Sequence, residues 1–375
     1  MKWSLLMLLL LWPSAGMAEE WQAELQNVLG LLDVTALEKA AEECGWLSGG
    51  VTGILEKLAR GEVLFTAAEV WNALASQAAG IFHSSLFRMT RLMAPALLAA
   101  AADWINDPQS PAGKTARYAG LVMTMAFLVS DLREHTALTL ETVTKMADWM
   151  QALFPVLITL MAAVGAVTSS AFYQPAVMAA AGSMTALVQQ ATLPLAAGIA
   201  VMTMVGGLSD GLRVTRMCRL FRQLANWTLG LGFTVFIGVM TVQGVSVAAV
   251  DGISIRTAKF AIDRFVPIVG GMFSDTVDTL VGCSLVVQHA AGMLGVLLLL
   301  GALIVPLIRT VLTMFLYRTA AALMEPVSDS PLCRTIGSYA DVFSLLFVIQ
   351  LSVGAMFLLL TAQMIAVADL TVMLR

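Results

Sequence analysis

Residues 149–209 read WMQALFPVLITLMAAVGAVTSSAFYQPAVMAAAGSMTALVQQATLPLAAGIAVMTMVGGLS and contain no charged side chain in 61 consecutive positions. A water-soluble domain rarely leaves so long a stretch without charges for its surface. As one helix the stretch would be roughly 90 Å long, whereas the hydrocarbon core of a bilayer is about 30 Å thick. We therefore expect the chain to enter a membrane and to turn back within or across it at least once.

The rest of the composition agrees with a membrane protein. Hydrophobic residues make up 59% of the chain and charged residues 12%, against about a quarter charged in ordinary globular proteins. Further charge-free windows cover 223–250, 279–308 and 342–368, and each exceeds the roughly 20 apolar residues that one helical span needs. None alternates as the strands of a membrane barrel do. The sequence predicts an all-α, polytopic helical membrane protein with six to eight spans.

The N-terminus has the features of a signal peptide. Lys2 precedes a short apolar core from Leu5 to Trp12, which is followed by Pro13 and the small-x-small triplet Gly16-Met17-Ala18. This order predicts a cleavable secretory signal over residues 1–18. No cysteine follows the expected cleavage point, which argues against a lipoprotein. The alternative is an uncleaved first anchor.

Residues 19–80 are predicted to form an acidic extracytoplasmic helical segment, before a helical membrane domain over 81–375. Ten acidic and three basic residues lie between Glu19 and Gln77. Apolar residues at roughly helical spacing predict short amphipathic helices joined at Gly45 and Gly49-Gly50. We interpret the acidic charge as a solvated face, with a basic partner as the alternative.

A first membrane element is predicted over 82–102, with Arg88 and Arg91 in its first half. These arginines indicate either a span whose end snorkels to the interface or an interfacial helix. A short apolar element is predicted over 118–130. It leads into 131–150, where apolar residues at helical spacing are interleaved with the polar residues Glu134, His135, Glu141 and Lys145. That pattern predicts an amphipathic helix.

Polar groups and prolines divide the charge-free stretch. They predict apolar pieces of about 151–167, 176–188 and 191–208, separated by Thr168-Ser169-Ser170, Tyr173-Gln174-Pro175 and Gln189-Gln190. The middle piece is too short to cross a bilayer upright. It is expected to be either a span lengthened by its polar ends or a re-entrant helix surrounded by protein.

Arginines at every third position follow this stretch, at Arg213, Arg216, Arg219 and Arg222. The positive-inside rule places the loop 209–224 in the cytoplasm. With an extracytoplasmic N-terminus, this orientation requires an odd number of crossings within 151–208. The spacing also matches a voltage-sensing helix. Because no intramembrane acids are spaced as countercharges, we favour contacts with anionic lipid headgroups.

Residues 251–279 directly follow a predicted span. Their apolar residues fall on one helical face, and the charged residues lie largely elsewhere: Arg256, Lys259, Asp263 and Arg264. This pattern predicts an amphipathic helix lying at the outer interface, broken at Pro267 and Gly270-Gly271. The alternative is a pore-lining element whose charged face meets the lumen.

Gln288 and His289 open an otherwise apolar predicted span. A polar pair inside a membrane is a functional candidate, although its place near the helix end favours interfacial hydrogen bonds. Together with the four charged residues of 251–279, this pair makes up the candidate interface or pore-lining set.

The sequence lacks the common catalytic motifs. It contains no GxxxxGK[ST] loop, no HExxH and no GxSxG, and its three histidines, His83, His135 and His289, fall on different predicted elements. Cys44, Cys218, Cys283 and Cys333 are too scattered for a CxxC ligand pair. We predict a protein that is not an enzyme, without catalytic residues, cofactor or metal site, and we expect no nucleic-acid partner. Any ATP-driven work must come from another chain.

The block GVMTVQGVSVAAVDGISIRTAKF at 238–260 and its continuation FVPIVGGMFSDTVDT at 265–279 resemble the stage III sporulation protein AE family. The similarity extends in weaker form over the whole chain. The resemblance implies a polytopic protein of the mother-cell membrane facing the forespore in an endospore-forming bacterium. It also implies partners: the other membrane subunits of a secretion-like channel, sometimes called a feeding tube, and a separate cytoplasmic ATPase.

Three hypotheses follow. The first is a non-enzymatic membrane subunit of a sporulation trans-envelope channel, with 19–77 and 251–280 as candidate docking surfaces. The second is a stand-alone secondary transporter or permease, in which the broken middle of the charge-free stretch would hold a substrate at the midplane. The third is an assembly scaffold without a conducting path, which the sequence does not separate from the first.

Overall fold

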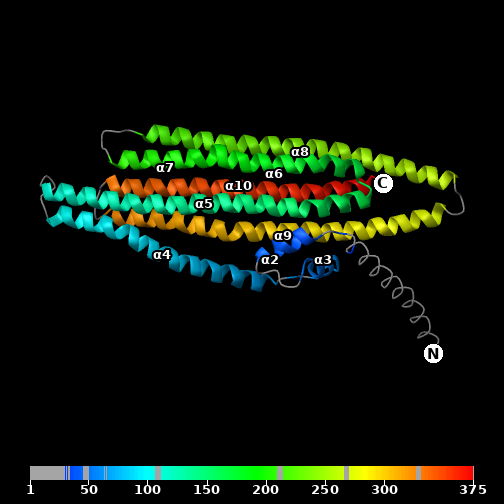
Figure 1. Ribbon diagram of the computed structural model, residues 1–375, viewed down its shortest axis with the longest axis horizontal. Helices are drawn as coiled ribbons and strands as arrows, with labels where there is room; N and C mark the ends of the chain where they lie inside the picture. The colour runs from blue at the N-terminus through cyan, green and yellow to red at the C-terminus, as the bar shows by residue number, and fades with distance from the viewer. Residues whose placement is uncertain are drawn as a thin grey trace, which may run out of the picture.

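In the computed structural model the chain forms an elongated bundle of long helices (Figure 1). The structure describes residues 30, 32, 34–44, 50–62, 64, 66–105, 111–208, 214–265, 270–326 and 331–374. Every regular element in these ranges is helical: α2 (Thr35–Cys44), α3 (Val51–Ala59), α4 (Ala67–Ile105), α5 (Pro111–Val164), α6 (Val167–Leu187), the π-helical turn η1 (Val188–Thr192), α7 (Leu193–Leu208), α8 (Thr215–Phe265), α9 (Gly270–Met324) and α10 (Pro331–Met373). The predicted all-α class is confirmed for the described residues.

Within the residues that the structure describes, five helical segments are long and apolar enough to cross a membrane. They cover Gly113–Val164, Val167–Gly207, Thr215–Ala258, Asp278–Met324 and Cys333–Met373. The predicted count of six to eight spans is therefore not confirmed, and α4, the predicted first element, is not among these five candidates. The predicted elements 118–130 and 131–150 and the piece 151–164 are all parts of α5. The predicted signal peptide lies outside the described residues.

The helices are longer than a bilayer is thick. Helices α5 and α9 have 54 and 55 residues, which corresponds to roughly 80 Å each, against about 30 Å of hydrocarbon. Figure 1 shows α4 and α5 extending past the other helices at one end, and α8 and α9 at the opposite end. Part of the bundle must therefore lie outside the hydrocarbon.

The charge-free stretch turns at a different place from the predicted one. The break falls at Gly165, whose φ is +98°, and residues from Val167 to Leu208 then form one continuous helical run with η1 in its middle. The predicted division into three pieces is therefore wrong. Its polar residues do not break the helix because their hydroxyls bond to carbonyls of the preceding turn, as those of Ser170 and Thr185 do at 2.8 and 2.9 Å.

A carboxylate from a distant helix caps the start of α6. Asp251 of α8 is buried, and its two oxygens accept hydrogen bonds from the backbone N–H groups of Thr168 and Ser169 at 2.9 and 2.7 Å. The first N–H groups of a helix have no partner within it, and they carry partial positive charge. The Asp251 carboxylate accepts hydrogen bonds from these N–H groups and places a negative charge beside their partial positive charge. It thereby connects the turn after α5 to α8.

Helix α10 lies in the middle of the bundle, against α5, α7, α8 and α9. Glycines allow close approach there, because a Cβ added at Gly354 would overlap Leu303 of α9. Helix α8 is peripheral: 18% of its most apolar window is buried, against 56% for the windows of α5 and α10. The exposed side of α8 is therefore the bundle's largest candidate lipid contact.

Two short amphipathic helices are confirmed in the N-terminal segment. Helices α2 and α3 contact α9, and α2 also contacts α5; both lie beside α9 on the side away from α8 (Figure 1). Their buried residues are apolar, among them Leu37, Val51 and Leu55. Helix α4 runs without a break across residue 80, the predicted boundary, and the soluble character of 19–80 stays a prediction.

Helix α4 begins with a reciprocal cap. The backbone N–H of Thr66 donates to the Glu69 carboxylate at 2.9 Å, and the Glu69 N–H donates to the Thr66 hydroxyl at 3.3 Å. The hydrogen bond from the Thr66 backbone N–H, followed by a contribution from the Thr66 side chain, lowers the pKa of Glu69 below its ordinary value.

The predicted interfacial helix over 251–279 differs from the structure. Residues 251–265 continue α8 without a break, and α9 begins at Gly270. These residues therefore form the outer ends of two long helices (Figure 1). The sequence pattern resembled a separate amphipathic helix because the charged residues of the segment begin at Asp251, where the charge-free window of the preceding span ends.

We predict that Asp251→Ala destabilises the bundle, because it leaves the Thr168 and Ser169 amides without their acceptor. Hydrogen bonds to charged groups contribute about 1.5–3 kcal/mol each, so losing both should lower the free energy of unfolding by about 3–6 kcal/mol, measured by denaturant titration in mixed micelles. The control is Ser254→Ala, one turn further along α8 on its exposed side. Equal stability of both variants would show that the cap is unimportant.

Candidate functional site

Charged and polar side chains gather where α4, α5, α9 and α10 meet. We name this cluster the polar layer; its members are Arg88, Arg91, Asp131, Glu134, His135, Thr139, Arg309, Thr310, Thr313, Tyr317 and Gln350. Most of these residues lie on candidate membrane spans. Ionisable residues in such segments are candidate functional positions by default.

Glu134 lies near two arginines. Arg88 of α4 donates to both of its oxygens, at 2.8 and 2.7 Å, in the two-point geometry that makes such pairs strong. Arg309 of α9 approaches the same carboxylate at 4.0 Å. The hydrogen bonds to Glu134 raise the pKa of Arg88 above its usual value, so Arg88 stays charged.

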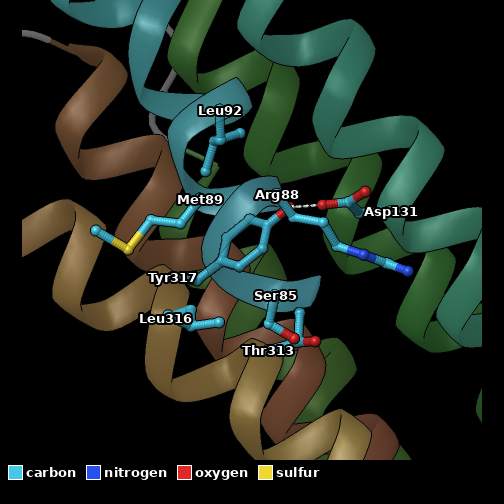
Figure 2. A pocket seen from close by; sticks show the side chains of 8 residues that line it. All are labelled: Ser85, Arg88, Met89, Leu92, Asp131, Thr313, Leu316 and Tyr317. Atoms are coloured by element: carbon cyan, nitrogen blue, oxygen red, sulfur yellow. Dashed lines mark hydrogen bonds between the residues drawn. The ribbon is translucent and has the colours of Figure 1, made fainter. Parts of the chain in front are cut away.

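Asp131 is the buried carboxylate of the layer. The Tyr317 hydroxyl of α9 donates to it at 2.7 Å (dashed in Figure 2), and Arg91 lies at 3.5 Å. The Arg91 guanidinium also stacks over the Phe127 ring, 4.9 Å from its centre. A small pocket of about 10 Å³ adjoins Asp131 and Tyr317 (Figure 2), with room for roughly one water molecule.

Uncharged polar residues continue the layer toward α10. The Thr313 hydroxyl lies 3.1 Å from Nε2 of His135, whose ring meets the edge of Phe343. Gln350 of α10 donates to the Thr139 hydroxyl at 2.8 Å and accepts from Thr310 at 3.2 Å. These hydrogen bonds are buried, and each joins two helices, so they fix the register of α5, α9 and α10.

The contacts of the polar layer hold α4, α5, α9 and α10 together. Glu134 is paired with Arg88, and the buried Asp131 is paired with Arg91 and accepts a hydrogen bond from Tyr317. Removing the partners of Asp131 would leave an uncompensated charge inside the bundle, which is strongly destabilising. In the described residues no group of three or more His, Cys, Asp or Glu side chains is arranged to hold a metal ion.

The predicted pair Gln288 and His289 lies elsewhere, at the end of the bundle where Asp251 caps α6. The buried Gln288 amide donates to the Met364 carbonyl at 3.4 Å, and its Oε1 has no partner among the described residues. His289 Nε2 lies 2.8 Å from the Asp369 carboxylate. Both residues thus join α9 to α10, and neither meets the polar layer.

The predicted headgroup arginines lie at the start of α8. Arg216 and Arg219 are exposed, whereas Arg222 pairs with Asp341 of α10 at 3.2 Å, an acid that Arg318 also approaches at 3.6 Å. The sequence analysis did not find this countercharge. Arg213 lies outside the described residues, and contact with headgroups stays a prediction.

The four charged residues predicted near the outer interface belong to α8. Arg256 is exposed, and the side chains of Lys259, Asp263 and Arg264 lie outside the described part of the structure. Their role as interface or pore-lining residues stays a prediction.

Sequence reasoning missed Asp131, Tyr317 and Gln350 as site residues. Gln350 offered a signal, because it is a polar amide inside the mostly apolar, charge-free window 342–368.

Together, five apolar helices and internally paired intramembrane charges define a helical membrane protein. The chain matches the stage III sporulation protein AE family over residues 50–368, and it belongs to that family. This match confirms the resemblance found in the sequence and supports a role in sporulation.

A curated relative gives the same assignment. The chain is 32% identical over 235 residues to the stage III sporulation protein AE of Bacillus subtilis (strain 168). The aligned region covers 63% of this chain and 59% of the relative, so the chain spans less than two thirds of the relative's length. No solved structure matches the chain.

We predict that Tyr317→Phe destabilises the protein by about 1.5–3 kcal/mol, because it removes a hydrogen bond to a buried carboxylate. Tyr339→Phe is the matched control: Tyr339 is equally buried, and its hydroxyl has no hydrogen-bond partner among the described residues. Its removal should be neutral or slightly stabilising. The free energy of unfolding in mixed micelles measures both, and equal effects would contradict the assigned role of Tyr317.

Proposed function

We propose that this protein is a non-enzymatic membrane subunit of a trans-envelope channel between mother cell and forespore. It would work with other membrane subunits and with a separate cytoplasmic ATPase, in the mother-cell membrane around the forespore. The observation that carries the proposal is the family match over 50–368, which includes nearly all of the five candidate spans.

The architecture fits a subunit better than a stand-alone transporter. A transporter of the kind predicted as the alternative would hold its substrate where helices are discontinuous, but the charge-free stretch after Gly165 runs as a continuous helix to Leu208. The pocket at the polar layer has room for roughly one water molecule. The layer's carboxylates are already paired within the chain, which favours a static role.

The expected dependence on other chains follows from the sequence. No nucleotide-binding loop is present, so energy for transport would come from a partner. The exposed charges of α2 and α3, among them Lys39, Glu42 and Lys57, offer a polar surface to such partners. The arginines at the start of α8 favour a cytoplasmic location for that end of the bundle.

We predict that deleting the gene in its own organism abolishes heat-resistant spores while vegetative growth is unchanged. Re-expression of the intact chain should restore spore counts. Normal spore counts in the deletion strain would contradict a sporulation role.

We also predict that the purified chain alone moves no solute across liposomes, and that other membrane proteins and an ATPase co-purify with it from sporulating cells. Mildly solubilised membranes from vegetative cells expressing the chain are the control for non-specific association. Solute uptake by liposomes containing only this chain would establish the transporter alternative instead.

A further inference from the structure

Two helices of the bundle expose faces of opposite character. The exposed face of α8 carries large apolar side chains along its whole length: Met217, Leu220, Leu224, Trp227, Leu231, Val235, Val239, Val242, Val245, Val250, Ile253 and Phe260. The exposed face of α5 between 133 and 163, a range that the structure describes completely, has none of that kind. Its exposed positions are Arg133, Glu134, Ala137, Glu141, Lys145, Asp148, Gln151, Pro155, Thr159, Ala162 and Ala163.

The polar face of α5 lies at the same depth as the most apolar part of α10. Gln350 of α10 donates a hydrogen bond to Thr139 of α5, and Thr361 of α10 contacts the sulfur of Met150 of α5. Met150 lies about one and a half helical turns after Lys145. Residues 139–150 of α5 are therefore level with 350–361 of α10. That segment is the centre of the charge-free window 342–368, so Glu141, Lys145 and Asp148 lie near mid-depth.

The apolar face of α8 reaches the same depth. Arg222 is level with Asp341 through their ion pair, and Thr241 is level with Gln363 through a 2.8 Å hydrogen bond. Val235 and Val239, between these two positions, are thus level with Asp148 and its neighbours. The bundle consequently presents an apolar side and a charged side to its surroundings at one depth.

Lipid is excluded as the surroundings of the charged side. One charged side chain at the centre of a membrane helix shifts the insertion equilibrium by roughly a hundredfold against the membrane. The Lys145 and Glu141 side chains pair at 3.0 Å, yet they remain 48% and 61% exposed, so pairing does not remove them from their surroundings. Charges in this position normally face a water-filled cavity.

We propose that the face of α5 formed by Ala137, Glu141, Lys145, Asp148 and Gln151 lines a water-filled path across the membrane, closed by further chains around it. The proposal rests on the proposed function, because a single bundle does not enclose this face. Water, rather than a packed partner helix, is the occupant favoured by the residues themselves: the face combines charges with small side chains and offers no large apolar residue for an interface core.

The surface of α2 and α3 also carries exposed charged residues. Helices α2 and α3 flank α9 on the side away from α8 (Figure 1). Their outward positions carry Lys39, Glu42, Lys57 and Arg60, all exposed. The hydrated region would therefore continue from α5 across these two helices.

Thiol accessibility in membranes from sporulating cells tests the proposal. Asp148→Cys and Gln151→Cys on α5 are compared with Val235→Cys and Val239→Cys on α8, at matched depth. A charged, membrane-impermeant methanethiosulfonate is applied, and labelling is read at each engineered site by mass spectrometry, so the native cysteines stay in place. We expect the α5 sites to react roughly a hundredfold faster, as the exclusion of charge from lipid requires.

Equally slow labelling at all four sites overturns the proposal, because it places α5 against lipid or against another protein. Only variants that restore heat-resistant spores are compared, which excludes misfolded protein. The two proposals fail separately. Slow labelling of α5 with intact co-purification of partners removes only the water-filled path, whereas fast labelling with solute uptake by the chain alone removes only the subunit assignment.

Discussion

Hydrocarbon offers neither hydrogen bonds nor screening, and this constraint explains most of the bundle. Backbone groups must be bonded within the chain, which is why α5 and α9 run unbroken for 54 and 55 residues. Hydroxyl side chains inside the spans bond back to their own helices. Where the chain does turn, at Gly165, a buried carboxylate from α8 receives the amides that open the next helix.

The same constraint organises the charged residues. At the polar layer, Glu134 and Asp131 are satisfied by arginines and by Tyr317, and at the opposite end His289 meets Asp369. These contacts join α9 to α5 and α10 at two levels, so the helices are held against sliding. The exposed charges Glu141, Lys145 and Asp148 of α5 lie on one side of the bundle, and the large apolar residues of α8 lie on another. The fold thus separates a lipid-facing side from a hydrated side.

Sequence reasoning reached the class, the membrane character and the family, because long charge-free windows and a family-specific block are local signals. It missed what depends on distant pairing. Thr168-Ser169-Ser170 looked like a break because its cap, Asp251, is 82 positions away from Ser169. The amphipathic pattern of 131–150 was found, but only the packing of α4, α9 and α10 shows that Asp131 and His135 are buried while Glu141 and Lys145 are exposed. The span count of six to eight is not confirmed, because α5 contains several of the elements that the sequence had divided.

The central claim is that lipid covers α8 and not the outer face of α5. Cryo-electron microscopy of the assembly extracted from sporulating cells into lipid nanodiscs tests it most directly. The account predicts ordered acyl-chain density along residues 223–250 and a lipid-free, solvent-filled space beside Glu141, Lys145 and Asp148. Acyl chains packed against those three residues would contradict it.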